Sequence, residues 1–579
     1  MGGTLIEDEE EEYWRLDFTT QTYVVIDAVT SSKVSLDAEI LDASGTELGE
    51  NIYSFDGFLG YVPGDGLIIR ERLSPGTYFI RVKLASRLEP RPVPYSIVAS
   101  EDVQFAQYFD TCNARTQALN NPSISDPLYA CQWHLESNEY VDINIESAWD
   151  AGALGEGVNV ALVDQGLDYR HEDLKDNVDL TLSHDYNDED EIYDRSEHHG
   201  THVAGILAAR DNSVGMRGVA PRATLFGYNP LSGFTRISEL ADAMTRNADI
   251  TAVSNNSWGI RQSVRAKRVS TLWERAIESG LDTGYGGKGT FYVFSGGNGH
   301  LLGDDSNLDE YANYYGVTAA CSVQGWGARA PHSEMGANLW VCAPSNERPG
   351  VRGLAGRFGV VTTEHSDNYV QDFGGTSAAA PVVSGVAALM RSVNPELTWR
   401  DLKLILAASA QKNDPNNAGW EDGARKYRSG SAADRYHFNH EFGFGLVDAG
   451  AAVELATEWV NVPYLEIGGA SSGKLSTTIP DATLDGESTT VSSSITLEND
   501  IGFTEFVEVN IELRHRSFRD LEVELVSPSG AVSRLPVPHD TSTDLFTYTD
   551  FIPLYGSFRF GSARLDTWER IRMESGHLG

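Results

Sequence analysis

The sequence predicts an α/β domain with a central, mostly parallel sheet, flanked by an N-terminal all-β sandwich-like domain and a C-terminal β-barrel or jelly-roll domain. Residues 106–462 alternate apolar runs such as NVALVD and TFYVFSGG with helical segments such as GTHVAGILAAR and RISELADAMTRN. Strands that alternate with helices form parallel sheets covered on both faces. Residues 1–105 and 463–579 instead contain short alternating runs without a helical period, which is typical of β domains.

Composition excludes two classes of partner. The net charge is −40, from 84 acidic and 44 basic residues, and such a surface repels nucleic acid and anionic lipid. No apolar run reaches the roughly 18 residues of a membrane-spanning helix. The start MGGTLIEDEEEEYW has no basic region followed by an apolar one, so we expect any secretion signal to have been removed. We expect an extracellular or periplasmic protein that binds neither nucleic acid nor membrane.

The four cysteines fall in two local pairs, Cys112 with Cys131 and Cys321 with Cys342. Neither pair has the CxxC spacing of zinc or redox sites. In an exported protein this distribution predicts two local disulfides, and free buried thiols are the alternative.

The stretch FGGTSAAAP places Ser377 between a glycine turn and a run of alanines. Thr376 or Ser377 is either the N-cap of a buried helix or, if a base and an acid lie nearby, Ser377 is a nucleophile. Active sites of parallel sheets lie at the carboxyl ends of strands. Asp164, His199 and Asn298 each stand at such a predicted end, although singly each fits a turn or cap residue. The chain order Asp, His, Ser is that of the subtilisin class.

The segments VALVDQGLD, HHGTHVAGI, NNSWG, FSGGNGH and GGTSAAAP resemble the subtilase family, and DPLYACQWHL and FGFGLVDAGAAVELA resemble its kexin and proprotein-convertase branch. The resemblance implies a subtilisin-like catalytic domain over residues 106–462. It implies that Ser377 is the nucleophile, His199 the base, Asp164 the orienting acid and Asn298 an oxyanion donor. The H-G-T pattern selects His199, so we interpret its neighbours His198 and His202 as structural.

The loop AARDNSVGMRGVAP resembles the subtilase calcium loop, although a polar surface loop is the alternative. Oxygen ligands are those that calcium prefers. The resemblance implies one Ca²⁺ held by the side chains of Asp126, Asp173 and Asn212 and the carbonyls of Arg210, Val214 and Met216. It implies a second Ca²⁺, beneath the substrate pocket, held by Asp304 and Glu334.

The pocket departs from the branch pattern. The resemblance implies that it is lined by Ser257, Trp258, Gly259 and the acid Asp309, but Gln262 replaces a second acid and Gln165 replaces the acid that contacts a basic P2 residue. A remaining carboxylate can still pair with a guanidinium. A processing endopeptidase selective for basic P1 residues and a general degradative protease therefore both stay open. A catalytically inactive binding protein is the third alternative.

The outer domains carry looser resemblances. Residues 1–105 resemble a pre-peptidase C-terminal domain through DAEILDASGTEL and LSPGTYFIRV. Because this domain lies outside the catalytic block, we hypothesise that it binds an insoluble substrate or partner. Residues 463–579 resemble the convertase P domain through DLEVELVSPSG, but the family's closing strands are not recognisable in FGSARLDTWERIRMESGHLG. No folding prodomain is visible. We therefore expect protein or peptide substrates, together with a folding chaperone or an inhibitor.

Overall fold

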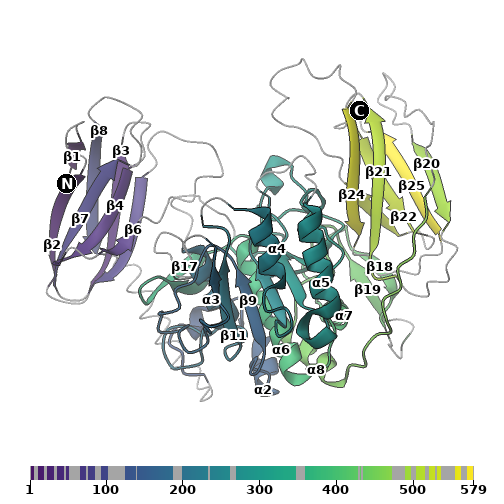
Figure 1. Ribbon diagram of the computed structural model, residues 1–579, viewed down its shortest axis with the longest axis horizontal. Helices are drawn as coiled ribbons and strands as arrows, with labels where there is room; N and C mark the ends of the chain where they lie inside the picture. Colours follow the sequence, from purple (N-terminus) through teal and green to yellow (C-terminus); the bar gives the residue numbers. More distant parts are fainter. Residues whose placement is uncertain are drawn as a thin grey trace.

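The computed structural model has three blocks of secondary structure, which follow the colour bar of Figure 1 from purple through teal and green to yellow. The structure describes residues 2–5, 11–18, 22–30, 36–44, 47–50, 66–73, 76–84, 93–101, 124–138, 140–186, 198–232, 235–260, 269–346, 359–427, 431, 434–471, 490–496, 504–515, 521–527, 531–535, 554–562 and 570–577. All statements below concern these residues.

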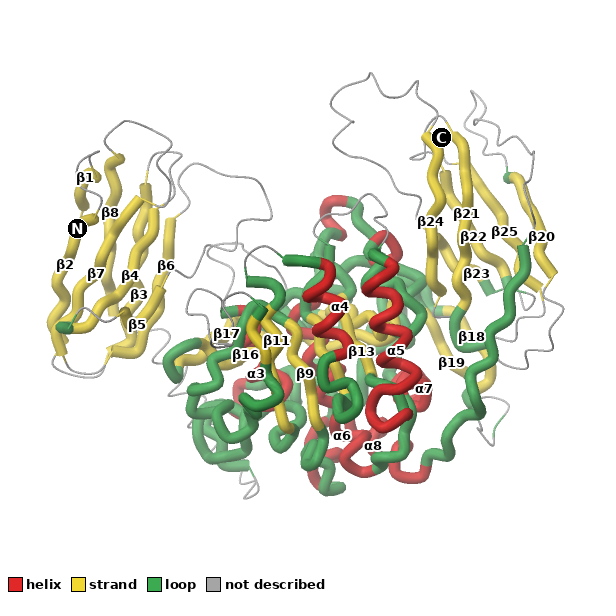
Figure 2. Tube along the Cα trace, in the orientation of Figure 1, coloured by secondary structure: helices red, strands yellow, loops and turns green. Residues whose placement is uncertain are grey.

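The N-terminal block consists of two antiparallel sheets with the strand orders β1-β8-β3-β6 and β2-β7-β4-β5 (Figures 1 and 2). Strands β4 and β5 of one sheet contact β6 of the other, and Leu41 and Ile80 are buried in this block. The arrangement is strand-only, as the sequence predicts. The strands are β1 (Gly2–Leu5), β2 (Glu11–Phe18), β3 (Thr22–Thr30), β4 (Leu36–Asp42), β5 (Glu47–Glu50), β6 (Gly66–Leu73), β7 (Gly76–Leu84) and β8 (Val93–Glu101).

The central block contains a seven-stranded sheet in the order β10-β11-β9-β12-β13-β14-β15, in which every neighbouring pair is parallel. From β9 the chain runs to the edge strand β10, returns to β11 and then crosses to β12 on the other side of β9. Ligand sites of such sheets lie at this switch point. The strands are β9 (Asn159–Val163), β10 (His184–Asp185), β11 (Thr224–Asn229), β12 (Val253–Asn256), β13 (Phe291–Ser295), β14 (Val317–Val323) and β15 (Leu339–Pro344).

Helices cover both faces of this sheet. Tyr292 on β13 donates its hydroxyl to the Met244 carbonyl of α4 (2.6 Å), whereas Asn255 on β12 accepts from Ser384 of α6 (2.8 Å). Ser254, the neighbour of Asn255, is the residue paired with Tyr292, so the two contacts lie on opposite faces. Figure 1 shows α4 and α5 side by side over one face. The helices are α2 (Ile145–Asp150), α3 (His199–Ala208), α4 (Ile237–Thr245), α5 (Thr271–Gly287), α6 (Thr376–Val393), α7 (Trp399–Ser409) and α8 (Ala449–Glu458).

Helix α6 is the described helix whose length and apolar composition would suffice to cross a membrane, and 83% of it is buried inside the structure. It packs against β12, β13, β14 and β15. Burial of this degree is that of a core helix.

Smaller elements complete the central block. The hairpin of β16 (Val360–Glu364) and β17 (Asn368–Phe373) packs against α3 and leads directly into α6. A second hairpin consists of β18 (Glu421–Arg425) and β19 (Arg435–Phe438). The 3₁₀ turns are η2 (Tyr129–Cys131), η3 (His300–Leu302) and η4 (Ser306–Leu308).

The predicted disulfide between Cys321 and Cys342 is present and joins β14 to β15. Its Cα atoms are 4.2 Å apart in directly paired positions. Cys131 is also disulfide-bonded, but its predicted partner Cys112 lies outside the described residues. That second pairing therefore stays a prediction.

The C-terminal block contains a four-stranded sheet, β20-β25-β22-β23, and a pair, β21-β24. The final strands β24 and β25 come from the tail in which the sequence shows no recognisable closing strands. They form because β24 pairs with β21 along its whole length and β25 fits between β20 and β22. The strands are β20 (Val491–Thr496), β21 (Val507–His515), β22 (Leu521–Val526), β23 (Val532–Leu535), β24 (Leu554–Ser562) and β25 (Arg570–His577).

Contacts from α7 join the central and C-terminal blocks. The Arg400 guanidinium makes a bidentate ion pair with Glu505, with Nε 2.8 Å from Oε2, and both side chains are largely buried. Lys403 lies with Nζ 4.1 Å from the centre of the Trp340 ring and 5.6 Å from that of Phe506. Planar, bidentate pairs of this kind fix orientation as well as adding energy.

Candidate functional site

Asp164 lies directly after β9, at the carboxyl edge of the sheet. Its amide donates to the Tyr228 carbonyl at 3.0 Å, so the residue still continues the parallel ladder. The residue is only 1% exposed. Its Oδ1 accepts from the Gln165 amide (2.8 Å) and lies 2.7 Å from His199 Nδ1. The structure thus joins the predicted acid to the predicted base, in the geometry that fixes an imidazole tautomer.

Helix α3 begins at His199, and the next residue has to be glycine. A Cβ on Gly200 would lie 1.8 Å from the carbonyl oxygen of Gly166 and 3.2 Å from Asp164 Cβ. Any side chain there would push the helix away from the loop that carries Asp164. The Gly in the H-G-T motif therefore keeps His199 within reach of its carboxylate.

Ser377 occupies the first turn of α6. The N-cap of this helix is Gly375, at φ 73°, without a side-chain capping bond, so the alternative that Thr376 or Ser377 is the N-cap is wrong. Ser377 Oγ donates to the Ser257 carbonyl (3.1 Å), and Ser257 Oγ donates to the Ser377 carbonyl (3.0 Å). These two bonds hold the start of α6 against the end of β12. The Ser377 hydroxyl has to leave the Ser257 carbonyl in order to give its proton to an imidazole.

Asn298 lies in the loop after β13, beside the start of α6. Its Oδ1 accepts from the Thr376 amide (2.8 Å) and from the Thr376 hydroxyl (3.0 Å). A backbone amide can only donate, so the atom that it contacts is the oxygen, and Nδ2 is left to donate elsewhere. A Cβ on Gly375 would lie 3.3 Å from Nδ2. The Asn298 donor is therefore held next to the loop that precedes Ser377.

The predicted pocket residues differ in how they are placed. Asp309 Oδ2 accepts from the Ile260 amide (2.8 Å) and would lie 2.4 Å from a Cβ on Gly259, so the acid adjoins the Ser-Trp-Gly segment. Burial raises the pKa of Asp309 to about 6. The Trp258 ring packs against Phe294, with centroids 5.0 Å apart, and belongs to an aromatic cluster.

The other two pocket predictions concern glutamines. Gln165 donates its amide to Asp164 and accepts a hydrogen bond from the Ser232 hydroxyl at its carbonyl. Both contacts use its backbone, so they fix the loop rather than the side-chain amide. Gln262 lies outside the described residues.

The residues of the first predicted calcium site gather around one loop. Asp126 Oδ1 accepts from the amides of Asn212 (3.2 Å) and Ser213 (3.0 Å). Asp173 Oδ2 accepts from the Met216 amide (2.9 Å). Within the described structure, the buried Asp173 Oδ1 has no hydrogen-bond partner. Burial raises the pKa of Asp173 to about 8 and that of Asp126 to about 6. Two buried carboxylates with an oxygen left unsatisfied fit a hard cation.

The backbone members of this set adjoin the same loop. The Val214 amide donates to Asn212 Oδ1 (2.9 Å), and the Asn212 amide donates to the Arg210 carbonyl (3.0 Å). The loop is thus folded on itself around Asn212.

Acidic residues also converge at the second predicted calcium site. Glu334 Oε1 accepts from the Gly299 amide (2.8 Å), and its pKa is raised far above the usual range by burial and by the neighbouring Asp304. Asp305, which no sequence motif singles out, is half-buried beside them, with a pKa raised to about 7 chiefly by desolvation. A cation would relieve the repulsion of this buried cluster.

A hydrogen-bonded Asp and His at the switch point of a parallel sheet, followed later in the chain by a serine, match the chain order of the subtilisin class of serine hydrolases. Comparison with known protein families identifies the family within this class. Residues 155–445 match the subtilase family, and residues 504–552 match the proprotein convertase P-domain. The chain belongs to the subtilase family, in its kexin branch, and contains a P domain.

Relatives include Protease KEX1 of Kluyveromyces lactis, 30% identical over 466 residues, which are 79% of this chain and 59% of the relative. Neuroendocrine convertase 2 of Homo sapiens is 30% identical over 485 residues, which are 79% of this chain and 72% of the relative. Kexin of Saccharomyces cerevisiae is 32% identical over 449 residues, 74% of this chain and 52% of the relative. The chain thus spans somewhat more than half the length of the yeast relatives.

Among solved structures, the serine protease of Aeromonas sobria in complex with a chaperone superposes with a TM-score of 0.66. It is 25% identical and covers 78% of this chain and 88% of its own. This similarity supports the subtilisin-like fold and extends beyond the central sheet.

Proposed function

We propose that this chain is a secreted, calcium-dependent serine endopeptidase in which Asp164, His199 and Ser377 form the catalytic triad. The observation that carries the proposal is the 2.7 Å contact between His199 Nδ1 and the buried Asp164 carboxylate, at the sheet edge where α6 also begins. The negative surface and the buried disulfide support export. Covalent labelling by a fluorophosphonate tests it: the reagent should modify Ser377, and a His199→Ala variant should react far more slowly.

The proposed mechanism uses groups of this chain only. Ser377 Oγ exchanges the Ser257 carbonyl for His199 Nε2 and attacks the substrate carbonyl as the imidazole takes its proton. Asp164 holds the Nδ1–H tautomer and stabilises the imidazolium. The Ser377 amide, in the first turn of α6, and Asn298 Nδ2 donate to the developing oxyanion. His199 then protonates the leaving amine, and water attacks the acyl-enzyme by the same route.

For specificity we propose a preference for basic P1 residues, supported by Asp309. This buried carboxylate adjoins Gly259, and burial raises its pKa because the charged form is desolvated. A guanidinium or ammonium group of the substrate would offset this cost of the charged form. A broad or apolar P1 choice remains the competing function, because Asp309 already accepts amide hydrogen bonds from Ile260 and Tyr311.

Asp309→Asn is expected to lower kcat/KM for Arg or Lys at P1 by about 10- to 100-fold, the value of a hydrogen bond to a charged group. Peptides with Leu or Phe at P1 should be cleaved at the wild-type rate, and they control for damage to the fold. A P1 library read by mass spectrometry provides both numbers. Equal losses on basic and apolar substrates would contradict a basic pocket and favour the degradative alternative.

Calcium is expected to stabilise the fold through the Asp126–Asp173 site and the Asp304–Glu334 site. Chelation of the Ser377→Ala protein should lower its melting temperature by about 5–10 °C, if each ion contributes about 3 kcal/mol. Asp173→Asn should abolish much of this response, whereas Asp176→Asn, exposed three residues along the chain, should retain it. Identical melting curves with calcium and with chelator would refute a structural role.

A folding chaperone is also proposed as a partner, because the Aeromonas sobria protease was solved with one. The N-terminal sheets are proposed to bind insoluble substrate. Deletion of residues 1–105 that leaves binding and turnover of large proteins unchanged would remove the second proposal.

A further inference from the structure

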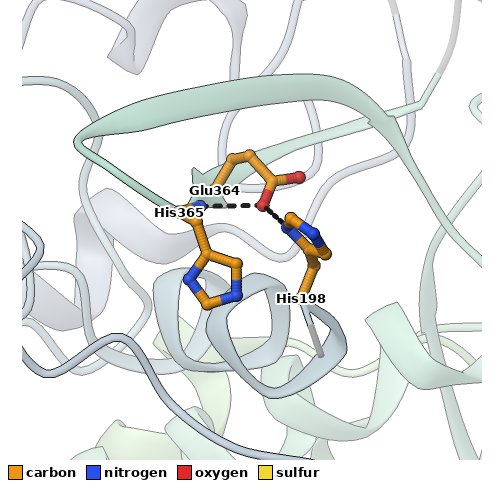
Figure 3. Close-up of side chains that lie close together, drawn as sticks. All are labelled: His198, Glu364 and His365. Atoms are coloured by element: carbon orange, nitrogen blue, oxygen red, sulfur yellow. Dashed lines mark hydrogen bonds and ion pairs between the residues drawn. The ribbon is translucent and has the colours of Figure 1, made fainter. Parts of the chain in front are cut away.

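Three side chains meet where the β16–β17 hairpin packs against the start of α3 (Figure 3). His198 directly precedes α3, Glu364 ends β16 and His365 follows it in the turn. His198 Nδ1 contacts Glu364 Oε1, and the rings of His198 and His365 lie with centroids 4.3 Å apart. One ligand atom from each of the three residues lies within 4.8 Å of the others. Glu364 and His365 are 4% and 5% exposed.

Two neighbours hold these ligands in place. His202, one helical turn after His198, contacts Glu364 Oε2 through Nε2 at 2.7 Å. Glu364 Oε1 lies on the side of His198 and also accepts from the His365 amide (2.7 Å, Figure 3). Asp168 Oδ2 lies 3.6 Å from His365 Nδ1 and also accepts from the Ser366 amide (3.1 Å). A carboxylate behind the second nitrogen of an imidazole is the usual support of a metal-binding histidine. His365 would then present Nε2.

Ligand chemistry selects the ion. Two imidazole nitrogens and one carboxylate oxygen suit Zn²⁺, whereas calcium takes oxygen ligands. The charges also balance, because the carboxylates of Glu364 and Asp168 together neutralise a divalent ion while the imidazoles stay neutral. A buried group of carboxylates and imidazoles without an ion needs extensive hydrogen bonding to offset desolvation.

We propose that His198, Glu364 and His365 form a zinc site, supported by His202 and Asp168. The ion would tie the β16–β17 hairpin to the start of α3, next to His199. Strand β17 ends at Phe373, whose ring lies 5.6 Å from that of His199 and which is followed by the loop to Ser377. The site therefore clamps the two segments that carry the proposed base and nucleophile, and it does not depend on the proposed activity.

The test uses the full-length Ser377→Ala protein in saturating calcium, so that the oxygen sites are filled. Isothermal titration with Zn²⁺ should show one equivalent bound, together with a higher melting temperature. Glu364→Gln and His365→Gln should weaken binding by at least about 10- to 100-fold, and Asp168→Asn by about 10-fold or more. His437→Gln, which replaces a half-buried histidine on β19, is the control and should bind zinc normally.

Co²⁺ substitution tests the proposed zinc site on the wild-type ligands, so it does not depend on whether a variant folds. Wild-type ligation by two imidazoles and a carboxylate should give the intense visible bands of four-coordinate Co²⁺. Absence of stoichiometric Zn²⁺ binding would overturn the site. So would bands of six-coordinate Co²⁺ only, or wild-type zinc affinity in folded Glu364→Gln and His365→Gln proteins.

Discussion

Replacing Ser377 with alanine is expected to lower kcat on peptide substrates by about a million-fold, the loss that removing a triad serine produces in the subtilisin class. The Ser377 hydroxyl is the group that forms the acyl-enzyme. Among the described residues, the other hydroxyl in the first turn of α6 beside Ser257 is that of Thr376. Thr376 cannot substitute, because its hydroxyl is buried and donates to Asn298 Oδ1 at 3.0 Å.

Ser392→Ala is the matched control, since Ser392 lies on the same helix and donates to the Leu389 carbonyl within its own turn (2.7 Å). Its kcat should stay within about twofold of wild type. Unfolding curves should show that both variants fold. If Ser377→Ala retained turnover above the level left by oxyanion binding, Ser377 would not be the nucleophile. If the wild type were as inactive as Ser377→Ala, the chain would be a binding protein and not a protease.

The positions of Asp164 and His199 could be predicted because local rules fix them. An apolar strand that ends in an acid, in a strand–helix alternation, places that acid at the carboxyl edge of a parallel sheet. Gly200 then marks the close approach of the helix that carries His199. The local sequence leaves open whether Thr376 or Ser377 caps the helix, and the structure places Gly375 at the N-cap instead.

Contacts between distant segments could not be predicted. Asn298 and Thr376 are 78 residues apart, and Ser257 and Ser377 are 120 apart, so no local pattern joins them. Glu364 ends a strand with no motif of its own, and its contact with His198 spans 166 residues. For this reason the carboxylate that His198 and His202 share could not be predicted from the sequence.

The final strands of the chain also could not be predicted from local sequence. The sequence of β24, LYGSFRFGS, has two glycines and a weak alternation, which are poor local signals for a strand. It forms because β21 offers nine paired positions, from His515 with Leu554 to Val507 with Ser562. Tertiary pairing, not local propensity, determines this strand.

Asn298→Asp is expected to lower kcat by about 100- to 1000-fold with little change in KM, a loss of about 2.7–4 kcal/mol of transition-state stabilisation. The aspartate keeps the shape and an oxygen that accepts from the Thr376 amide and hydroxyl. It lacks the N–H group, however, and places a negative charge where the oxyanion forms. The substitution therefore removes the donor while it leaves the scaffold of that donor intact.

Two further variants separate donation from scaffolding. Asn298→Ala should lose a similar factor in kcat, because it also lacks the donor. Thr376→Val removes one of the two hydrogen bonds that orient Asn298 and leaves the amide bond of 2.8 Å, so only a few-fold loss is expected. Steady-state kinetics on one good peptide substrate measures all three. If Asn298 donates directly to the oxyanion, Asn298→Asp and Asn298→Ala must lose far more kcat than Thr376→Val. A loss of kcat in Thr376→Val as large as that in Asn298→Asp would instead assign the effect to the shape of the Ser377 loop.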